Sequence, residues 1–443
     1  MRATILVYFG WIALGSISSL VACSSSEPEP PMTSPPDSGG IALGPEDAGQ
    51  RDPEDSGRSG AEAGPGTEVQ APKCTDAGWC ETSLPDEDLV LKDVWPLDGR
   101  AFAIAYSLTL GVKVLEWKES DAAWSYIDDG TQNEDFAQYV GRIWAPNENE
   151  VYYGVDPGYI YHGTRPTPPA TKWSWTRQRL KDNSHADIVH PQDGYPKYFQ
   201  LNANYPTLGI WGTSVDDVYA WFTDTIYRRT KFDGDTFEWV PEYIANDASG
   251  AAEHMYFVAA TGSGPDDLWF SGTRTRSPSL AACAVLVHRT GGDYLRIADG
   301  VLSSNTGRCA AKPGYLSIGG AEGWLTDIHM RSVNEIVGLK GARDVVKVSI
   351  AEGGYSVSVA TVPMALDQEP LSSLWADPGS LWLSGFGTVV RASGDVWDGG
   401  AFQLSSVAVT GAPLGRHLYQ VRGTSNTNLW AIGVRNALHK TTP

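Results

Sequence analysis

The chain has 443 residues, of which 53 are acidic and 33 are Lys or Arg, so its formal net charge at neutral pH is -20. This acidic balance argues against nucleic acid and against anionic membrane surfaces as partners. The length exceeds what one ordinary hydrophobic core uses, unless the fold is an array of repeats.

Residues 1–22 have the pattern of a secretory signal peptide. A charged start at Arg2 precedes an apolar run from Ile5 to Leu14, which is short for a membrane span. The following tetrapeptide, Leu20-Val-Ala-Cys23, resembles the lipobox of bacterial lipoproteins. The resemblance implies that Cys23 is lipidated and that the protein is exported as an outer-membrane lipoprotein, facing the periplasm or the surface. An ordinary cleaved signal and an uncleaved anchor are the alternatives.

Residues 23–73 form a predicted lipidated tether. They are rich in Pro, Gly, Ser and acidic residues and contain almost no large apolar side chain. Such a segment cannot bury enough surface to offset its chain entropy, so we expect it to be disordered. The membrane contact that we expect is through the lipid alone.

Four cysteines remain once Cys23 is assigned to the lipid: Cys74, Cys80, Cys283 and Cys309. In an oxidising compartment an even set predicts two disulfides. Nearness in sequence favours Cys74–Cys80 and Cys283–Cys309 over the other pairings. A zinc site is the alternative, which the absence of a CxxC spacing disfavours.

Residues 74–443 contain seven copies of one pattern, in which an apolar pair, a polar turn and a second apolar run follow one another. The copies start at Val94, Ile143, Ile210, Ala260, Ile328, Leu374 and Val421, at intervals of 46 to 68 residues. This period, with several short strands in each unit, predicts an all-β, seven-bladed β-propeller. Apolar residues run consecutively or alternate, which disfavours a helical solenoid.

The last copy ends after its third strand, whereas the other units carry an aromatic residue of a fourth strand about thirty residues after their start. The segment around Trp79 is similar to the fourth-strand segment around Trp239. We therefore expect the front of the propeller domain to complete the last blade, so that the N- and C-terminal segments pair and close the ring.

The units resemble the loosely Asp-box-like propellers of bacterial secreted lipoproteins. Ser120-Asp-Ala-Ala-Trp124 and Gly234-Asp-Thr-Phe-Glu-Trp239 carry the likeness, although neither has the full Ser-x-Asp-x-Gly-x-Thr-Trp pattern. The resemblance covers about residues 74–443 and implies the fold alone.

Two stretches depart from the repeat. The first, residues 164–206, is aromatic and supplies our candidate binding residues: Trp173, Trp175, His185, Asp187, His190, Tyr195, Tyr198 and Tyr205. Such faces are used to bind proteins or sugars. The alternatives are that a Trp packs between blades and that the two histidines and Asp187 hold a metal. The second stretch, residues 289–322, surrounds Cys309 and is stapled if Cys283–Cys309 forms.

Basic residues share one register of the third strand: His162, Arg228, His288, Arg391 and His439. They could line a channel for an anionic ligand, but their recurrence favours a structural position of the repeat. The acids of the first turn could bind calcium, but one acid per blade is more simply explained by turn chemistry.

No His-Glu-x-x-His, Gly-x-Ser-x-Gly or phosphate-binding glycine loop is present in the sequence. The sequence therefore favours a cell-envelope binding or scaffold protein, without cofactor or catalytic residue, whose loops recognise a protein or a glycan. A glycan-directed hydrolase or lyase is the alternative function, because the separation of two carboxylates is a property of the fold.

Overall fold

The computed structural model describes residues 73–134, 139–184, 208–234, 236–245, 253–276, 282–303, 308–320 and 322–442. The predicted tether lies almost entirely outside these ranges. The described residues form β-strands, and their one helical element is the 3-10 turn η1 (Thr131–Asn133). No helix in these ranges is long and apolar enough to cross a membrane.

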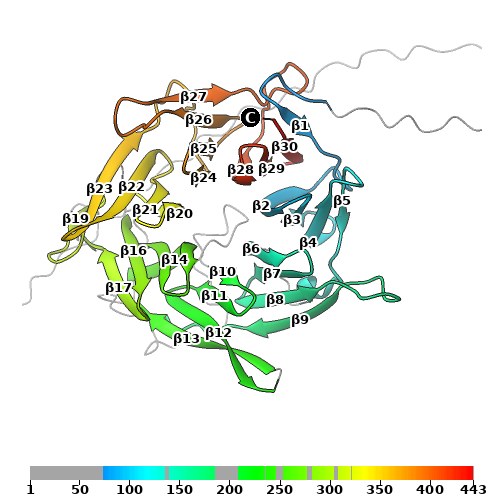
Figure 1. Cartoon of the computed structure of the whole chain (residues 1–443), viewed down its shortest axis with the longest axis horizontal. Coiled ribbons are helices and arrows are strands. Elements are labelled where there is room, and N and C mark those ends of the chain that lie inside the picture. The colour runs from blue at the N-terminus through cyan, green and yellow to red at the C-terminus, as the bar shows by residue number, and fades with distance from the viewer. Residues whose placement is uncertain are drawn as a thin grey trace, which may run out of the picture. The chain divides into compact units, whose positions relative to one another are not determined.

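Seven four-stranded antiparallel sheets surround a common axis, as the sequence predicted (Figure 1). The first three blades contain β2 (Val90–Leu97), β3 (Arg100–Ser107), β4 (Gly111–Lys118) and β5 (Ala123–Tyr126); β6 (Val140–Asn147), β7 (Glu150–Val155), β8 (Tyr159–Thr164) and β9 (Ser174–Arg179); and β10 (Leu208–Ser214), β11 (Asp217–Phe222), β12 (Thr225–Asp233) and β13 (Thr236–Ile244).

The next three blades have the same strand order from the axis outward. They contain β14 (Glu253–Gly264), β15 (Asp267–Arg276), β16 (Ala282–Thr290) and β17 (Asp293–Ala298); β20 (Leu325–Ser332), β21 (Glu335–Lys340), β22 (Asp344–Ala351) and β23 (Gly354–Thr361); and β24 (Ser373–Asp377), β25 (Ser380–Ser384), β26 (Val389–Ser393) and β27 (Ala401–Ser405). A two-stranded hairpin, β18 (Gly300–Leu302) and β19 (Cys309–Ala311), follows the fourth blade.

The seventh blade joins the two ends of the propeller. It contains β28 (Leu418–Ser425), β29 (Asn428–Gly433) and β30 (Asn436–Lys440), and its outermost strand is β1 (Trp79–Glu81). Trp79 pairs with Lys440, and Cys80 pairs with His439. The predicted closure by the front of the domain is therefore confirmed. The strand β1 completes the seventh blade, which then has four strands like the other six.

The hydrophobic core is divided among the blade interfaces. Six clusters of buried apolar side chains each join residues from two adjacent blades. A seventh cluster joins the second and third blades and includes Tyr256 of the fourth. The second strands are buried because both of their faces are covered by neighbouring blades, and in β11 and β25 every residue is buried. The consecutive apolar runs of the repeat are the sequence signature of this double burial.

Polar contacts near the axis connect neighbouring blades. The Asp93 carboxylate on β2 accepts a hydrogen bond of 3.0 Å from the backbone N–H of Ile143 on β6. The Ser373 hydroxyl on β24 likewise accepts one of 2.6 Å from the backbone N–H of Val421 on β28. These side chains satisfy backbone groups that an innermost strand leaves unpaired.

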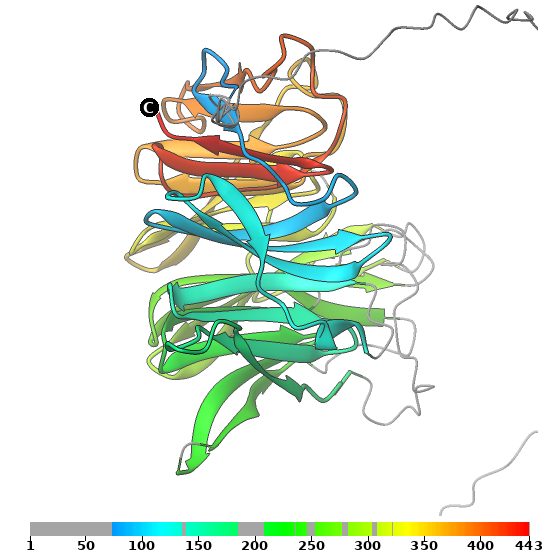
Figure 2. The same ribbon diagram turned by 90° about the vertical axis from the view of Figure 1, so that its right-hand side faces the viewer.

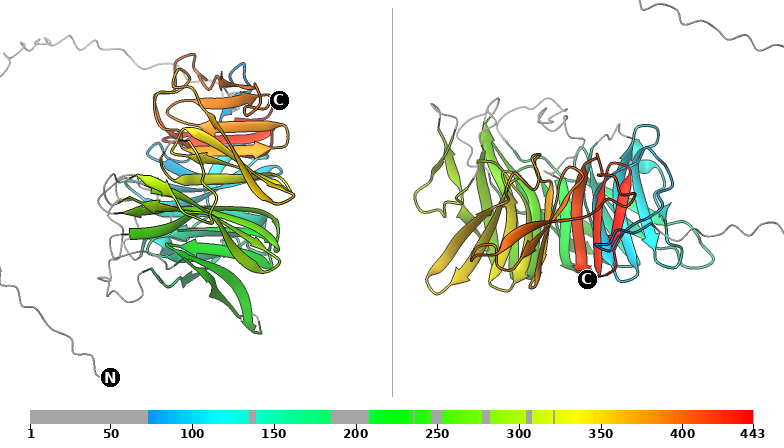
Figure 3. Two further views of the ribbon diagram at one scale, coloured as in Figure 1. Left: turned by 90° about the vertical axis from the view of Figure 1, so that its left-hand side faces the viewer. Right: turned by 90° about the horizontal axis from the view of Figure 1, so that it is seen from above.

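The chain enters every blade from the same side of the ring. Connections from an outermost strand to the next innermost strand, and turns between second and third strands such as Thr223–Asp224, therefore emerge on one side. We call this side the loop face; Figures 2 and 3 show the strands of all blades running between it and the opposite side. The hairpin β18–β19 belongs to the loop face.

Candidate functional site

The histidines of the third strands pack within the blades, whereas Arg391 on β26 is exposed and its guanidinium lies 5.3 Å from the centroid of the Trp382 ring. The rings of His162, His288 and His439 stack on second-strand aromatic rings, with centroids 4.2, 3.9 and 4.1 Å apart. Nε2 of His288 lies 2.9 Å from Asp267, and Nε2 of His162 lies 3.0 Å from Glu150. These pairs hold adjacent strands together, so the shared register is an architectural feature of the repeat.

The turn acids are used in the same way. Asp217 accepts hydrogen bonds from Tyr219 and Arg228 at 2.9 and 3.1 Å. Within the described ranges, no group of three or more His, Cys, Asp or Glu residues could hold a metal ion. Glu150, Asp217 and Asp267 thus act as partners of third-strand basic residues, whereas Glu335 pairs with Arg331 on β20 at 3.2 Å.

Trp173 and Trp175 lie between the first and second blades. Trp175 donates a hydrogen bond of 3.0 Å to the carbonyl of Ile127, and a Cβ at Gly163 would lie 2.4 Å from its ring. The Trp173 ring is in edge contact with Phe102 at 5.8 Å. Both rings are half-buried and pack against the core of this interface. A ligand contact at their exposed edges stays a prediction.

The other predicted binding residues fall in the connection between β9 and β10. They lie outside the described residues: His185, Asp187, His190, Tyr195, Tyr198 and Tyr205. Their role as binding residues also stays a prediction.

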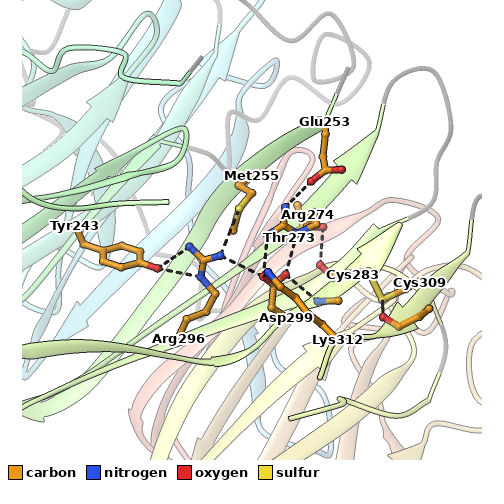
Figure 4. A network of polar contacts seen from close by, with 12 residues as sticks. Tyr243, Glu253, Met255, Thr273, Arg274, Cys283, Arg296, Asp299, Cys309 and Lys312 are labelled. Carbon is orange, nitrogen blue, oxygen red and sulfur yellow. Dashed lines mark hydrogen bonds and ion pairs between the residues drawn. A yellow bond between two sulfur atoms is a disulfide. The ribbon is translucent and has the colours of Figure 1, made fainter. Parts of the chain in front are cut away.

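The hairpin β18–β19 is fixed to the fourth blade by a disulfide. The structure contains both predicted disulfides, Cys74–Cys80 and Cys283–Cys309. Cys283 is buried on β16, and Cys309 begins β19, so the second disulfide joins a blade strand to the hairpin (Figure 4).

Beside this disulfide lies a buried ion network (Figure 4). Arg274, 3 % exposed, binds the carboxylates of Glu253 and Asp299, the latter at 2.8 Å. Lys312, on the segment after the hairpin, lies 2.9 Å from Asp299. Burial alone would raise the pKa of Asp299, but the hydrogen bonds from Arg274 and Lys312 hold that pKa well below its usual range. The network anchors both ends of the inserted hairpin.

A second polar cluster lies at the loop face of the third blade. Asp182 accepts a hydrogen bond of 2.9 Å from the Thr223 hydroxyl, and Asp224 accepts one of 2.9 Å from Thr225. Burial and, to a smaller degree, the charge of Asp182 raise the pKa of Asp224 to about 6. A carboxyl group of this kind can hold a proton near neutral pH.

Near the axis, five innermost strands carry a β-bulge at corresponding places. The register shifts lie between Leu91 and Asp93, Val140 and Ile143, Phe257 and Ala259, Leu325 and Asp327, and Leu418 and Gln420. Bulges re-aim side chains out of the regular alternation. Lys92, Arg142, Thr326 and Tyr419 all lie within these shifts.

Arg142 reaches across the axis from β6. Its guanidinium donates hydrogen bonds to the Gln420 side chain on β28 (3.0 Å) and to the Thr326 carbonyl on β20 (3.2 Å). It also lies 3.8 Å from Asp93 and 3.7 Å from Asp327. These partners belong to the first, fifth and seventh blades, which a residue of the second blade can meet together only through the centre. Arg142 therefore narrows the channel at this level.

Lys92 has a different environment from Arg142. Its residue is only 5 % exposed, and Nζ lies 3.9 Å from the centroid of the Tyr419 ring. Within the described part of the chain, no hydrogen bond or ion pair to this amine is present. Burial lowers the pKa of Lys92 to about 8. Nε2 of Gln420 is also buried and has no hydrogen-bond partner there.

The axial residues escaped the sequence analysis, although a signal was present. A charged or amide residue stands directly before the apolar start of several copies, at Asp93, Arg142, Asp327 and Gln420. Such a residue is unexpected in a buried strand unless it has a polar partner. The partners come from other blades and cannot be identified from one copy.

Comparisons with known proteins support the fold. No family model and no curated protein matches the chain. The solved structure of YCF48 bound to D1 peptide has a TM-score of 0.51 at 13 % identity and covers 84 % of this chain and 99 % of its own. The structure of YCF48 from Cyanidioschyzon merolae has a TM-score of 0.49 at 12 % identity, covering 83 % of this chain and 99 % of its own. The Cps50 (Swd1) β-propeller domain of Myceliophteria thermophila has a TM-score of 0.44 at 8 % identity, covering 77 % of this chain and 94 % of its own. At these identities the similarity concerns the fold alone.

Proposed function

We propose that this chain is an exported, lipid-anchored binding or scaffold protein of the cell envelope, which recognises a protein through the loop face of its propeller. The observation that carries the proposal is the hairpin β18–β19. It is an addition to the repeat, and a disulfide together with a buried ion network fixes it at one place on the loop face. Rigid presentation of an added surface is what a recognition site requires.

Three further observations support a binding role. The recurrent histidines His162, His288 and His439 stack on aromatic rings of the second strands and hold the blades together. The YCF48 propeller, which shares the fold, has been solved bound to a peptide. The two disulfides are consistent with an oxidising, exported compartment.

Recognition is tested with the purified, oxidised full chain as bait against envelope extracts and glycan fragments. Two variants alter the loop face: Val301→Glu changes the hairpin at a 48 % exposed position, and a second variant has residues 185–206 replaced by a short connection. Phe232→Ser on the opposite side of the ring is the control, because Phe232 is 73 % exposed. We expect Val301→Glu, but not the control, to lose the specific partner, and a loss in the short variant would extend the binding surface to residues 185–206. Equal retention by all four proteins would contradict recognition at the loop face.

The lipid anchor is tested separately with Cys23→Ser. The wild-type chain is expected to incorporate a labelled fatty acid and to partition into the membrane fraction, whereas the variant incorporates none. Equal labelling of both proteins would remove Cys23 as the lipidated residue.

A glycan hydrolase or lyase is the second candidate function, and one observation favours it. At the loop face, Asp182 and Asp224 accept hydrogen bonds from Thr223 and Thr225 of one turn, and burial raises the pKa of Asp224 to about 6. A carboxyl group that holds a proton near neutral pH, with a second carboxyl group nearby, is the arrangement from which general acid and base catalysis is built. Shortening of glycan fragments by the wild type, abolished in Asp224→Asn, would support the enzyme. Fragments that are retained intact by the wild type would support the binding protein.

A further inference from the structure

A line of four side chains leads from the axis toward the loop face. Lys92 lies over the Tyr419 ring, Tyr419 stacks on His417 at 5.7 Å, and His417 contacts Phe386 edge to face at 4.9 Å. Phe386 is 41 % exposed and lies in the turn between the second and third strands of the sixth blade. We call these four residues the axial ladder.

The inner end of the axial ladder has one uncompensated positive charge. Arg142 and Arg422 both approach Asp93, at 3.8 and 3.4 Å, and Arg142 also approaches Asp327. These two cations and two carboxylates balance, whereas Lys92 contacts only an aromatic ring among the described residues. A buried ammonium without an anionic partner is costly, so its retention requires a reason.

Two donors at this place are suited to an acceptor. Gln420 Nε2 is buried without a hydrogen-bond partner among the described residues, and the assignment of Nε2 follows from the Arg142 hydrogen bond to Oε1 of the same amide. Lys92 Nζ, which contacts the Tyr419 ring, can likewise only donate. Tyr419 and Gln420 project from one bulge of β28, next to β2. A single carboxylate would match both the donors and the one excess charge.

We propose that the inner end of the axial ladder binds the C-terminal carboxylate of a partner polypeptide, with the last side chain of that polypeptide against Tyr419, His417 and Phe386. The inference rests on the proposed function and specifies the chemistry of its partner. The aromatic steps of the ladder suit an apolar last residue, and the exposed edge of Phe386 gives access from the loop face. A dianionic phosphate would leave a negative charge unmatched beside Asp93.

The test uses a synthetic peptide array, attached through the N-termini, in which every last residue is present as a free carboxylate and as a C-terminal amide. Binding of the labelled full chain is compared with binding of Lys92→Met and Lys92→Arg. Lys172→Met, at an exposed lysine, is the matched control. Uronic acid oligosaccharides and acetate are tested as competitors.

We expect the wild type to prefer carboxylates over amides by at least about tenfold, which corresponds to about 1.4 kcal/mol. The preference should be lost in Lys92→Met and kept in Lys92→Arg and Lys172→Met. Lys92→Met should unfold at the same or a higher urea concentration than the wild type, because methionine removes an unpaired buried charge while keeping an unbranched side chain that is only one atom shorter. A purely structural lysine would instead leave the peptide preference unchanged and lower the urea midpoint.

A measurement on the wild type stands apart from the variants. A bound carboxylate peptide should protect Lys92 from acylation by an activated ester, read by mass spectrometry, whereas its amide should not. Equal protection, equal binding of carboxylates and amides, or competition by uronates but not by peptides would each overturn the inference. If the bait still captures its partner in that case, the proposed function stands and only the axial site is wrong.

Discussion

Replacing Trp79 by alanine is expected to weaken the closure of the ring. Trp79 is fully buried on β1, its indole N–H donates a hydrogen bond of 3.0 Å to Ser405, and its ring meets Trp382 edge to face at 5.9 Å. Deleting a buried Trp side chain typically costs about 3–5 kcal/mol of unfolding free energy. Since β1 spans only Trp79–Glu81, few other contacts can compensate, and we expect about 4 kcal/mol.

The measurement is urea unfolding of the oxidised protein, with Trp79→Phe and Trp239→Ala as matched variants. Trp79→Phe keeps an aromatic ring and should lose about 1–2 kcal/mol, mostly the hydrogen bond and some packing. Trp239 occupies the outermost strand of the third blade but is only half-buried, so Trp239→Ala should cost less than Trp79→Ala. A loss below about 1 kcal/mol for Trp79→Ala, or one no greater than for Trp239→Ala, would refute the closure of the seventh blade by β1.

Three further predictions concern the stapled hairpin and the histidines. Replacing both Cys283 and Cys309 by serine should lower the unfolding free energy by about 3 kcal/mol on the loop-entropy model, measured by urea unfolding; an unchanged midpoint would contradict this. Arg274→Met should cost less than the roughly 3–5 kcal/mol of a fully uncompensated buried charge, about 2 kcal/mol in the same assay, because Arg276 stays 3.2 Å from Glu253, and Arg296 and Lys312 stay 3.2 and 2.9 Å from Asp299; a stabilised variant would contradict this. Burial lowers the pKa of His439 to about 4. Below about pH 6.5 this histidine is protonated in the unfolded chain but stays neutral in the folded protein. The free energy of unfolding should therefore fall as the pH is lowered from 6.5 to 4. His439→Gln should reduce that fall, and an identical pH profile for the variant would argue against this histidine as a cause.

The architecture could be predicted because each blade follows from a local sequence pattern. Each blade repeats one sequence of apolar runs and turns, so seven copies gave seven blades. The similarity between the segments around Trp79 and Trp239 was enough to place β1 in the last blade. The disulfide pairings followed from nearness, because Cys74 and Cys80 are separated by only 6 residues and Cys283 and Cys309 by 26.

The polar sites were decided by the tertiary structure alone. A β-bulge is a property of the pairing between two strands, so neither Lys92 nor Tyr419 is marked in its own segment. Arg142 donates a hydrogen bond to Gln420, which is 278 residues away in the sequence. Arg274 pairs with Asp299, which directly precedes a hairpin that the repeat does not contain. Local periodicity reports which side chains are buried between blades. Only the closed ring brings seven innermost strands around one axis, and with them the charges and unpaired donors that distinguish this propeller from its own repeat.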